Sequence, residues 1–268
     1  MRVHPSSVVE DGAVVGANVE IGPFCHVGAH VMLEDGVKLR SHVSVTGITR
    51  LGARCDLYPG VAIGGAGQIR GNDFLEGRLE IGPDCVLREM VSMHVGSRKG
   101  GGLTKVGAGG YFMANSHVGH DCKVGDNVTF ANSVALGGHV EIGDGVIFGG
   151  LSAVQQFCRV GKGAMIGGLT GINRDVIPYA MAFGDHAELA GLNLIGLKRR
   201  GLSRDTINAM RATFRAVFYG EGGKLADRAR AARDRYPDVA EVGEMVDFIL
   251  ADAKQELCLG RRRRGEAP

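Results

Sequence analysis

Two pairs of residues have a spacing that suits acyl-transfer chemistry. Gly138 follows His120 by the same number of residues as His139 follows Asp121. This interval equals three units of a six-residue repeat (hexads) that is described below. If the chain completes one turn over that interval, His120 lies one strand spacing from Gly138, whose backbone N–H no side chain covers. A histidine beside a bare N–H combines a general base with an oxyanion donor. This pairing predicts transfer of an acyl group.

Two other interpretations of the histidines compete with this one. Taken singly, His94, His117, His120 and His139 are as readily surface residues of turns, because none occupies an inward position of the repeat. A zinc site is the second alternative, since histidines bind zinc in trimeric enzymes that resemble the gamma-class carbonic anhydrases. In those enzymes two ligands are more widely spaced than His117 and His120, and residue 122 here is a cysteine in an interior position. We therefore expect no metal and no cofactor.

A six-residue period supplies the elements that would position these residues. Apolar residues open 26 hexads in three runs, from Val3 to Ile63, from Ile81 to Met93 and from Val106 to Ile172. Glycine takes the second position in 14 of the 26, and the fifth position is small or β-branched throughout. Such a chain turns every six residues, with an inward aliphatic residue beside each corner and a glycine that relieves crowding there. Three hexads form one coil, and coils stack at about 4.8 Å.

Stacking of every third hexad makes further predictions. Phe112, Phe130 and Phe148 should form a buried aromatic ladder. Residues 64–79 and 95–105 interrupt the hexads, and insertions of this kind project as loops that often carry binding residues. Five cysteines occupy fifth positions and should fill the interior rather than bind metal: Cys25, Cys55, Cys85, Cys122 and Cys158.

Composition limits the class of protein. Glycine accounts for 44 of the 268 residues, while only seven prolines and no Gly-X-Y period exclude collagen. A net charge of +2 with 44% hydrophobic residues argues against disorder. The sequence has no apolar run of membrane-spanning length and no secretory signal. Six cysteines without a CxxC pair fit a reducing compartment, so we expect a cytoplasmic protein.

The C-terminal third has a different pattern. From an N-cap at Ser203, apolar residues at helical spacing predict a helix that stops at Gly220. We expect further helices over residues 224–235 and from Val239 to Lys254. The expected organisation is a β-helix domain over residues 1–180 and an α-helical domain over residues 181–268.

Three segments resemble the UDP-N-acetylglucosamine O-acyltransferase family, which begins lipid A synthesis. They are residues 115–122, 154–158 and 196–201, and the similarity covers nearly the whole chain. The resemblance implies a left-handed parallel β-helix followed by a small helical domain. It also implies transfer of an (R)-3-hydroxyacyl group from acyl carrier protein to the 3-position of a UDP-amino sugar, UDP-N-acetylglucosamine.

Site residues are implied by the same resemblance. His120 is the expected general base for the sugar hydroxyl, Asp121 helps to hold its imidazole in the basic tautomer, and Gly138 donates its N–H to the oxyanion. Gly168 corresponds to the floor of the acyl groove, where glycine indicates a long chain. The remaining implied substrate contacts are Gln68, His94, His117, His139, Gln156, Asn193, Arg199 and Arg200.

Departures from the family pattern leave the acceptor open. Family members usually show Gln-Asp-Leu-Lys where this chain has Gln68-Ile69-Arg70-Gly71, so an acidic and a basic contact are missing. Ile195 replaces a usual glutamate and Gln155 a usual histidine. The alternative acceptor is a 3-amino analogue of UDP-N-acetylglucosamine, which would give an amide. A third hypothesis, a non-catalytic hexapeptide scaffold, is disfavoured by the intact catalytic set.

The expected partners follow from the same features. Site residues that point outward from a flat face cannot enclose a substrate by themselves, and a second β-helix packed alongside can complete the cleft. We therefore expect a homotrimer with clefts between subunits. Acyl carrier protein is acidic, and residues 198–215, with six basic residues and one acidic residue, form its expected dock. We expect no nucleic acid binding and no stable membrane insertion. The tail that runs from Arg261 to Arg264 is assigned no role.

Overall fold

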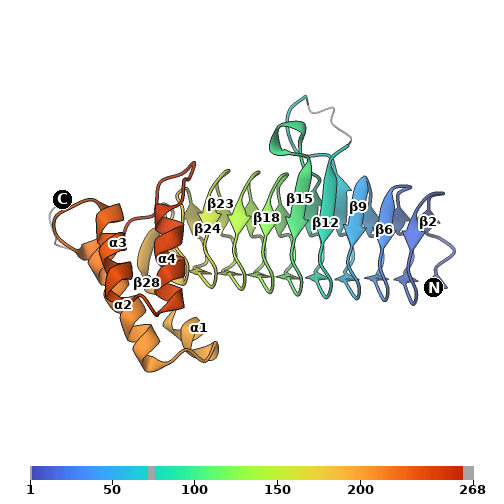
Figure 1. Ribbon diagram of the computed structural model, residues 1–268. Coiled ribbons are helices and arrows are strands. Elements are labelled where there is room, and N and C mark those ends of the chain that lie inside the picture. The colour runs from blue at the N-terminus through green and yellow to red at the C-terminus, as the bar shows by residue number, and fades with distance from the viewer. Residues whose placement is uncertain (1, 72–75, 262–268) are drawn as a thin grey trace.

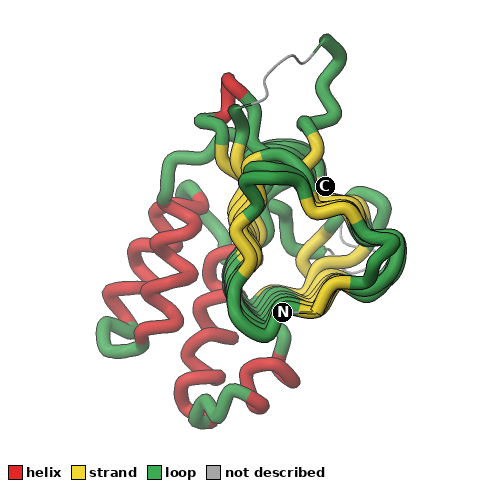
Figure 2. The backbone as a smooth tube through the Cα atoms, turned by 90° about the vertical axis from the view of Figure 1, so that its right-hand side faces the viewer, coloured by secondary structure: helices red, strands yellow, loops and turns green. Residues whose placement is uncertain are grey.

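The larger part of the molecule is a prism of three parallel β-sheets. The computed structural model describes residues 2–71 and 76–261. Successive strands pass from sheet A to sheet B to sheet C and back, so that each sheet receives every third strand (Figure 1 and Figure 2). This is the predicted left-handed parallel β-helix.

The strands are short, and most have two residues. Sheet A contains, in spatial order, β1 (Arg2–Val3), β4 (Glu20–Ile21), β7 (Lys38–Leu39), β10 (Asp56–Leu57), β13 (Val86–Leu87), β16 (Tyr111–Phe112), β19 (Thr129–Phe130), β22 (Ile147–Phe148), β25 (Met165–Ile166), β27 (Ala180–Phe183) and β28 (Glu188–Leu192). Sheet B contains β2 (Val8–Val9), β5 (His26–Val27), β8 (Ser44–Val45), β11 (Ala62–Gly65), β14 (Ser92–His94), β17 (His117–Val118), β20 (Ala135–Leu136), β23 (Ala153–Val154) and β26 (Gly171–Ile172). Sheet C contains β3 (Val14–Val15), β6 (Val31–Leu33), β9 (Ile48–Leu51), β12 (Arg78–Ile81), β15 (Leu103–Val106), β18 (Lys123–Val124), β21 (Glu141–Ile142) and β24 (Arg159–Val160).

The six-residue period is confirmed strand by strand. Each of the 26 apolar residues that open a hexad lies in one of the strands β1 to β26. Neighbouring strands of one sheet are offset by three hexads where no insertion intervenes, as in the pairing of Val118 with Leu136. Residues at the same position of every third hexad therefore lie side by side in these coils.

Two hexad positions shape the corners of the prism. Where the second position is glycine, the next coil can lie too close for a side chain, since a Cβ on Gly119 would lie 2.8 Å from the Leu136 carbonyl oxygen. The fourth position has a left-handed backbone at many corners, with φ of 60° at Asp121 and 62° at His139. Both of these residues therefore stand on the turn itself rather than on a strand.

The interior of the prism is apolar and closely packed. Phe112, Phe130 and Phe148 are fully buried, and their ring centroids are 5.0 and 4.9 Å apart, which confirms the predicted ladder. The five fifth-position cysteines are buried free thiols, as predicted: Cys25, Cys55, Cys85, Cys122 and Cys158.

The two predicted insertions cover one edge of the prism. The first follows β11, and the second follows β14 and contains the short helix η1 (Arg98–Gly100). Both project from the same side of the prism (Figure 1 and Figure 2). Because each leads from sheet B to sheet C, both lie at the edge between these sheets. Residues 72–75 of the first insertion lie outside the described residues.

The C-terminal region caps the prism and forms helices. β27 extends sheet A in parallel with β25, and β28 turns back antiparallel to it. Next come α1 (Leu194–Arg199), α2 (Arg204–Tyr219), α3 (Leu225–Arg235) and α4 (Ala240–Leu250), beside the C-terminal coils (Figure 1). The predicted N-cap of α2 is confirmed, since the Ser203 side chain accepts the Thr206 N–H. α3 lies within its predicted range.

The last helix ends before its predicted limit at Lys254. α4 stops at Leu250, and Ala251 is extended. The following segment is bonded to the prism instead, because Asp175 donates its N–H to Glu256 and accepts the N–H of Cys258. The Cys258 side chain is fully buried there. These tertiary contacts favour an extended path that helical periodicity does not reveal.

Two expectations concern the arginine tail and membrane insertion. Residues 262–264 of the arginine tail lie outside the described residues. No helix within residues 2–71 and 76–261 is long and apolar enough to span a membrane.

Removal of the central ring of the aromatic ladder should destabilise the prism. We expect Phe130→Ala to lower the free energy of unfolding by about 3–5 kcal/mol, because it leaves a cavity between two rings. Equilibrium urea unfolding followed by circular dichroism measures this change. Ile195→Ala, at a side chain that is 67% exposed, is the control and should shift stability by less than about 0.5 kcal/mol. A comparably small effect of Phe130→Ala would contradict a closely packed ladder.

Candidate active site

Four histidines gather at the edge between sheets B and C. His120 lies on the corner between β17 and β18, and His139 lies on the same corner of the next coil. Their ring centroids are 5.1 Å apart, edge to face. His94 of β14 and His117 of β17 lie on the adjoining face of sheet B, with ring centroids also 5.1 Å apart. Residues that are far apart in the sequence thus form one cluster.

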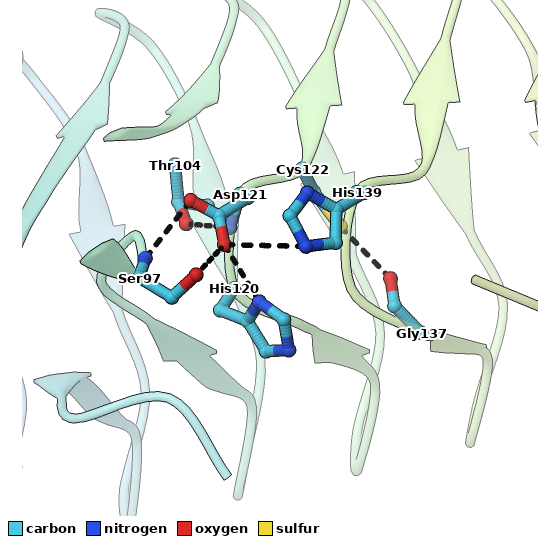
Figure 3. Close-up of polar contacts among 7 residues, drawn as sticks. All are labelled: Ser97, Thr104, His120, Asp121, Cys122, Gly137 and His139. Atoms are coloured by element: carbon cyan, nitrogen blue, oxygen red, sulfur yellow. Dashed lines mark hydrogen bonds and ion pairs between the residues drawn. The ribbon is translucent and has the colours of Figure 1, made fainter. Parts of the chain in front are cut away.

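Asp121 is the polar centre of this edge, with a side chain only 1% exposed. The His120 Nδ1–H donates to Asp121 Oδ2 at 2.7 Å, and the Ser97 hydroxyl donates to the same oxygen at 2.6 Å (Figure 3). The Ser97 backbone N–H donates to Oδ1 at 2.9 Å. A buried carboxylate requires such donors. Their geometry fixes the His120 ring with Nδ1–H toward Asp121, which leaves Nε2 to accept a proton.

The Nε2 atom of His120 lies over Gly138. A Cβ added to Gly138 would come within 2.5 Å of Nε2, so a larger residue would displace the ring. The Gly138 N–H donates to no group within the described part of the chain. A histidine poised to act as a base and a free backbone donor therefore lie next to each other, which is the arrangement that acyl transfer requires.

Two residues of the second insertion support Asp121 and were not among the predicted site residues. Besides the two bonds from Ser97, the Asp121 N–H donates to Thr104 Oγ1 at 2.8 Å (Figure 3). Gly100 lies against the carboxylate so closely that a Cβ there would collide with Asp121 Cγ. The sequence could have indicated Ser97, because this residue occupies an interior fifth position of a hexad. A polar side chain at such a position needs a buried hydrogen-bond partner.

Burial favours the uncharged form of the neighbouring histidines. Desolvation, with repulsion from His94 and His120, lowers the pKa of His117 to about 4. Desolvation and His120 also lower the pKa of His94, and desolvation is the main cause of the lowered pKa of His139. The Nδ1 atom of His94 is buried and makes no hydrogen bond within the described residues. Neutral imidazoles at this edge can exchange hydrogen bonds with hydroxyl groups.

His120, Asp121 and His139 could offer three ligand atoms to a metal ion, since these atoms all lie within 4.8 Å of one another. His120 Nδ1 and Asp121 Oδ2, however, are only 2.7 Å apart and share a hydrogen bond. Two ligands of one tetrahedral zinc ion lie roughly 3.3 Å apart. Ligation by both of these atoms would require His120 to leave Asp121, and as observed the two side chains share a hydrogen bond instead.

Two other predicted contacts lie near the histidines. Gln156 is on the coil after Gly138, at the same edge of the prism. Gln68 is exposed in the first insertion, next to Gly67. A Cβ on Gly67 would lie 2.9 Å from His120 Cβ, so this insertion packs directly on the histidine.

The remaining predicted contacts lie on other edges of the same prism. Gly168 is between β25 and β26, at the edge between sheets A and B. Arg199 and Arg200 lie at the end of α1, and Arg200 contacts Gly145 at the edge between sheets C and A. The buried side chain of Asn193 bonds to Gly163 and Gly196 and caps α1. A single chain therefore does not bring these residues together with His120.

Comparisons with known proteins agree over nearly the whole chain. A family model described as UDP N-acetylglucosamine O-acyltransferase, domain 2, matches residues 175–258, and a bacterial transferase hexapeptide model matches residues 12–47. An acyl-(acyl-carrier-protein)-UDP-N-acetylglucosamine O-acyltransferase from Rhizobium johnstonii is 45% identical over 256 residues, covering 96% of this chain and 94% of the relative. A protein of the same name from Caulobacter vibrioides is 53% identical over 200 residues, covering 75% and 76%. The structure of LpxA from Acinetobacter baumannii is similar with a TM-score of 0.92 at 35% identity, covering 96% of this chain and 99% of that one.

The lowered pKa of His117 predicts a pH dependence of stability. Its value of about 4 in the folded chain is below the ordinary histidine value of about 6.5, so the unfolded chain binds the proton first on acidification. Stability should therefore fall as the pH drops from about 6.5 toward 4. NMR titration of labelled histidines and urea unfolding at several pH values measure the two effects. His117→Gln should weaken this fall, and a His117 midpoint near the ordinary value would contradict the expectation.

Proposed function

Because the chain belongs to the family of acyl-(acyl-carrier-protein)-UDP-N-acetylglucosamine O-acyltransferases, we propose that it acylates the 3-hydroxyl of UDP-N-acetylglucosamine. The acyl donor is (R)-3-hydroxyacyl-acyl carrier protein, and the reaction is the first step of lipid A synthesis. The observation that carries the proposal is the buried His120–Asp121 pair beside the free N–H of Gly138. Six free cysteines suit a reducing compartment, and we place the enzyme in the cytoplasm.

The mechanism follows from the orientation of His120. Its Nε2 removes the proton from the sugar hydroxyl while the hydroxyl oxygen attacks the thioester carbonyl. Asp121 stabilises the imidazolium that forms, and the Gly138 N–H donates to the oxyanion of the tetrahedral intermediate. When the intermediate collapses, the carbon–sulfur bond breaks and the thiolate of the carrier takes the proton from His120. The products are the ester and the free carrier thiol.

The other site residues bind rather than react. We assign His94, His117, His139 and Gln156 to the sugar and the adjoining part of the acyl chain, because they lie on the coil of His120 or on nearby coils at the same edge. Gln68 reaches the same space from the first insertion. Other residues act from other edges: Gly168 leaves room for a long acyl chain, and Asn193 places α1 and with it Arg199 and Arg200.

The outward residues of the three sheets favour a homotrimer. In the C-terminal coils sheet C carries charged side chains, such as Lys123 and Glu141, and suits solvent. Sheet A presents larger side chains, such as Tyr111 and Met165, whereas sheet B presents small ones such as Ala153. Large and small surfaces of this kind suit packing of sheet A of one chain on sheet B of the next. The edge between them exposes apolar side chains: Phe24, Met90, Leu151 and Leu169.

This packing would also complete the active site. With sheet A on sheet B, the edge that carries His120 faces the edge of the next chain that carries Arg200. Gly168 lies at the edge between sheets A and B, deep within the same interface. A cleft between two chains would then contain the base, the basic side chains and space for the acyl group.

A basic surface on α1 and α2 is the proposed dock for acyl carrier protein. Its six cations are exposed and form no ion pair within the described residues: Lys198, Arg199, Arg200, Arg204, Arg211 and Arg215. A hollow of about 280 Å³ between β28 and α2 is lined in part by Arg211 and Arg215. Unpaired cations beside a hollow suit an acidic protein.

The 3-amino sugar is the second candidate acceptor. It is favoured by the segment from Gln68 to Gly71, which supplies no carboxylate for the sugar hydroxyls. Incubating the purified protein with each nucleotide sugar and hydroxyacyl-carrier protein, and then weighing the products, decides between ester and amide. We expect the ester, and efficient turnover of the amino sugar alone would contradict it.

Loss of the base should abolish turnover and leave the fold intact. We expect His120→Ala to lower kcat by about two to four orders of magnitude, because His120 is the imidazole that Asp121 orients beside Gly138. His30→Ala, at an exposed corner of an N-terminal coil between β5 and β6, is the matched control and should keep full activity. Circular dichroism checks folding, and retained activity of His120→Ala would remove the histidine from the mechanism.

Neutralising the basic surface should weaken binding of the carrier. Arg199→Gln with Arg200→Gln should raise the KM for acyl carrier protein about tenfold, and higher salt should reduce the difference from the unmodified chain. Initial rates at several carrier concentrations measure this effect. Arg230→Gln on α3, where the arginine is paired with Asp227, is the control. An unchanged KM in the double variant would place the dock elsewhere.

A further inference from the structure

His139 and His120 face the same carboxylate oxygen. His120 Nδ1 is 2.7 Å from Asp121 Oδ2, whereas His139 Nε2 is 3.7 Å from it, beyond hydrogen-bond distance (Figure 3). A small movement of His139 would close that gap. His139 would then compete with the general base for its partner.

The competition has a chemical consequence. If His139 acquired a proton, its Nε2–H would be attracted to Asp121, and the carboxylate would be shared between two imidazoles. A second positive charge beside His120 would also lower the basicity of His120. The reaction therefore requires His139 to stay uncharged and in its place.

Phe157 provides one constraint on His139. The two rings are stacked, with centroids 4.5 Å apart and an interplanar angle of 12°. Phe157 has a left-handed backbone with φ of 69°, a conformation that costs a bulky residue about 1–2 kcal/mol. Glycine fills the same hexad position at Gly145 and Gly163. The strained corner thus carries a large ring that covers His139.

Lys254 provides a second constraint, from the segment after α4. Its ammonium is 4.4 Å from the centroid of the Phe157 ring. The segment is fixed on the same coil, because the Gln255 side chain donates to the Gln156 carbonyl at 3.2 Å and Glu256 accepts the Asp175 N–H at 2.7 Å. The extended path of the chain therefore brings a cation to the ring that covers His139.

We propose that Phe157 and Lys254 are positioning residues. They clamp His139 at a distance from Asp121 at which the two cannot form a hydrogen bond, so that His120 keeps the carboxylate as its partner. The proposal rests on the proposed function, since His120 is the base there. The charged and titratable groups that face His139 are Asp121, His120 and Lys254. Burial is the largest cause of its lowered pKa, His120 and Lys254 lower it further, and Asp121 alone opposes them. Removing the cover or the cation should therefore raise the pKa of His139.

The test uses Phe157→Ala and Lys254→Met, with NMR titration of labelled histidines assigned through His139→Gln. We expect the His139 midpoint to rise in both variants, by about one pH unit without the ring and by less without the cation. The acid limb of kcat should move in the same direction, while the KM for acyl carrier protein stays within about twofold. Lys254→Arg keeps the cation and should restore the unmodified titration.

Tyr236→Ala is the matched control for the titration. The Tyr236 ring also lies beside a cation, with the Arg235 guanidinium 5.5 Å from its centroid, and it belongs to the helical region. Its removal should leave the His139 midpoint unchanged. A change of equal size in this control would show that the Phe157 effect is not local.

The outcomes separate the clamp from the proposed function. An unchanged His139 midpoint in folded Phe157→Ala, or an effect confined to KM, overturns the clamp while acyl transfer stands. Shifted midpoints in a chain that transfers no acyl group support the clamp and overturn the function instead. If Phe157→Ala does not fold, the two Lys254 variants test the proposal instead. Lys254 is exposed, so Lys254→Met and Lys254→Arg change only a surface side chain.

Discussion

Close stacking of the coils is the constraint on which the rest of the molecule depends. A Cβ on Gly119 would lie 2.8 Å from the next coil, so the second hexad position must be glycine wherever backbones approach this closely. The pairing of strands in each sheet fixes the register at three hexads between uninterrupted coils. Because register converts sequence spacing into spatial adjacency, His120 and Gly138 become neighbours. The glycine content of the chain is thus a requirement of the fold before it is a feature of the site.

The chemistry arises where the repeat is interrupted. A regular corner would leave the Asp121 carboxylate with few donors, and a buried charge without donors is strongly disfavoured. The second insertion supplies Ser97 and Thr104, and Gly100 packs flat against the carboxylate. The first insertion packs on His120 through Gly67. A regular scaffold therefore gives the spacing, and two irregular segments give the burial that orients His120.

Separate edges of the prism carry separate parts of the proposed site. His120 is at the edge between sheets B and C, Gly168 at the edge between A and B, and Arg200 at the edge between C and A. Convex edges of one prism cannot enclose a substrate, which is why association is part of the proposed function. The segment after α4 adds a link between the helical region and the histidine cluster, because Lys254 contacts the ring that covers His139.

By itself the sequence determined the period, the inward positions, the phenylalanine ladder and the adjacency of His120 and Gly138, because one register repeats in every uninterrupted coil. It also determined α2 through the Ser203 cap, which is a local signal. Only the tertiary structure decided the support of Asp121 by Ser97 and Thr104, since an insertion has no period that could predict its path. The tertiary structure likewise decided that α4 ends at Leu250, because backbone hydrogen bonds to Asp175 and burial of Cys258 compete with helix formation. The spacing of apolar residues along the chain cannot reveal these contacts.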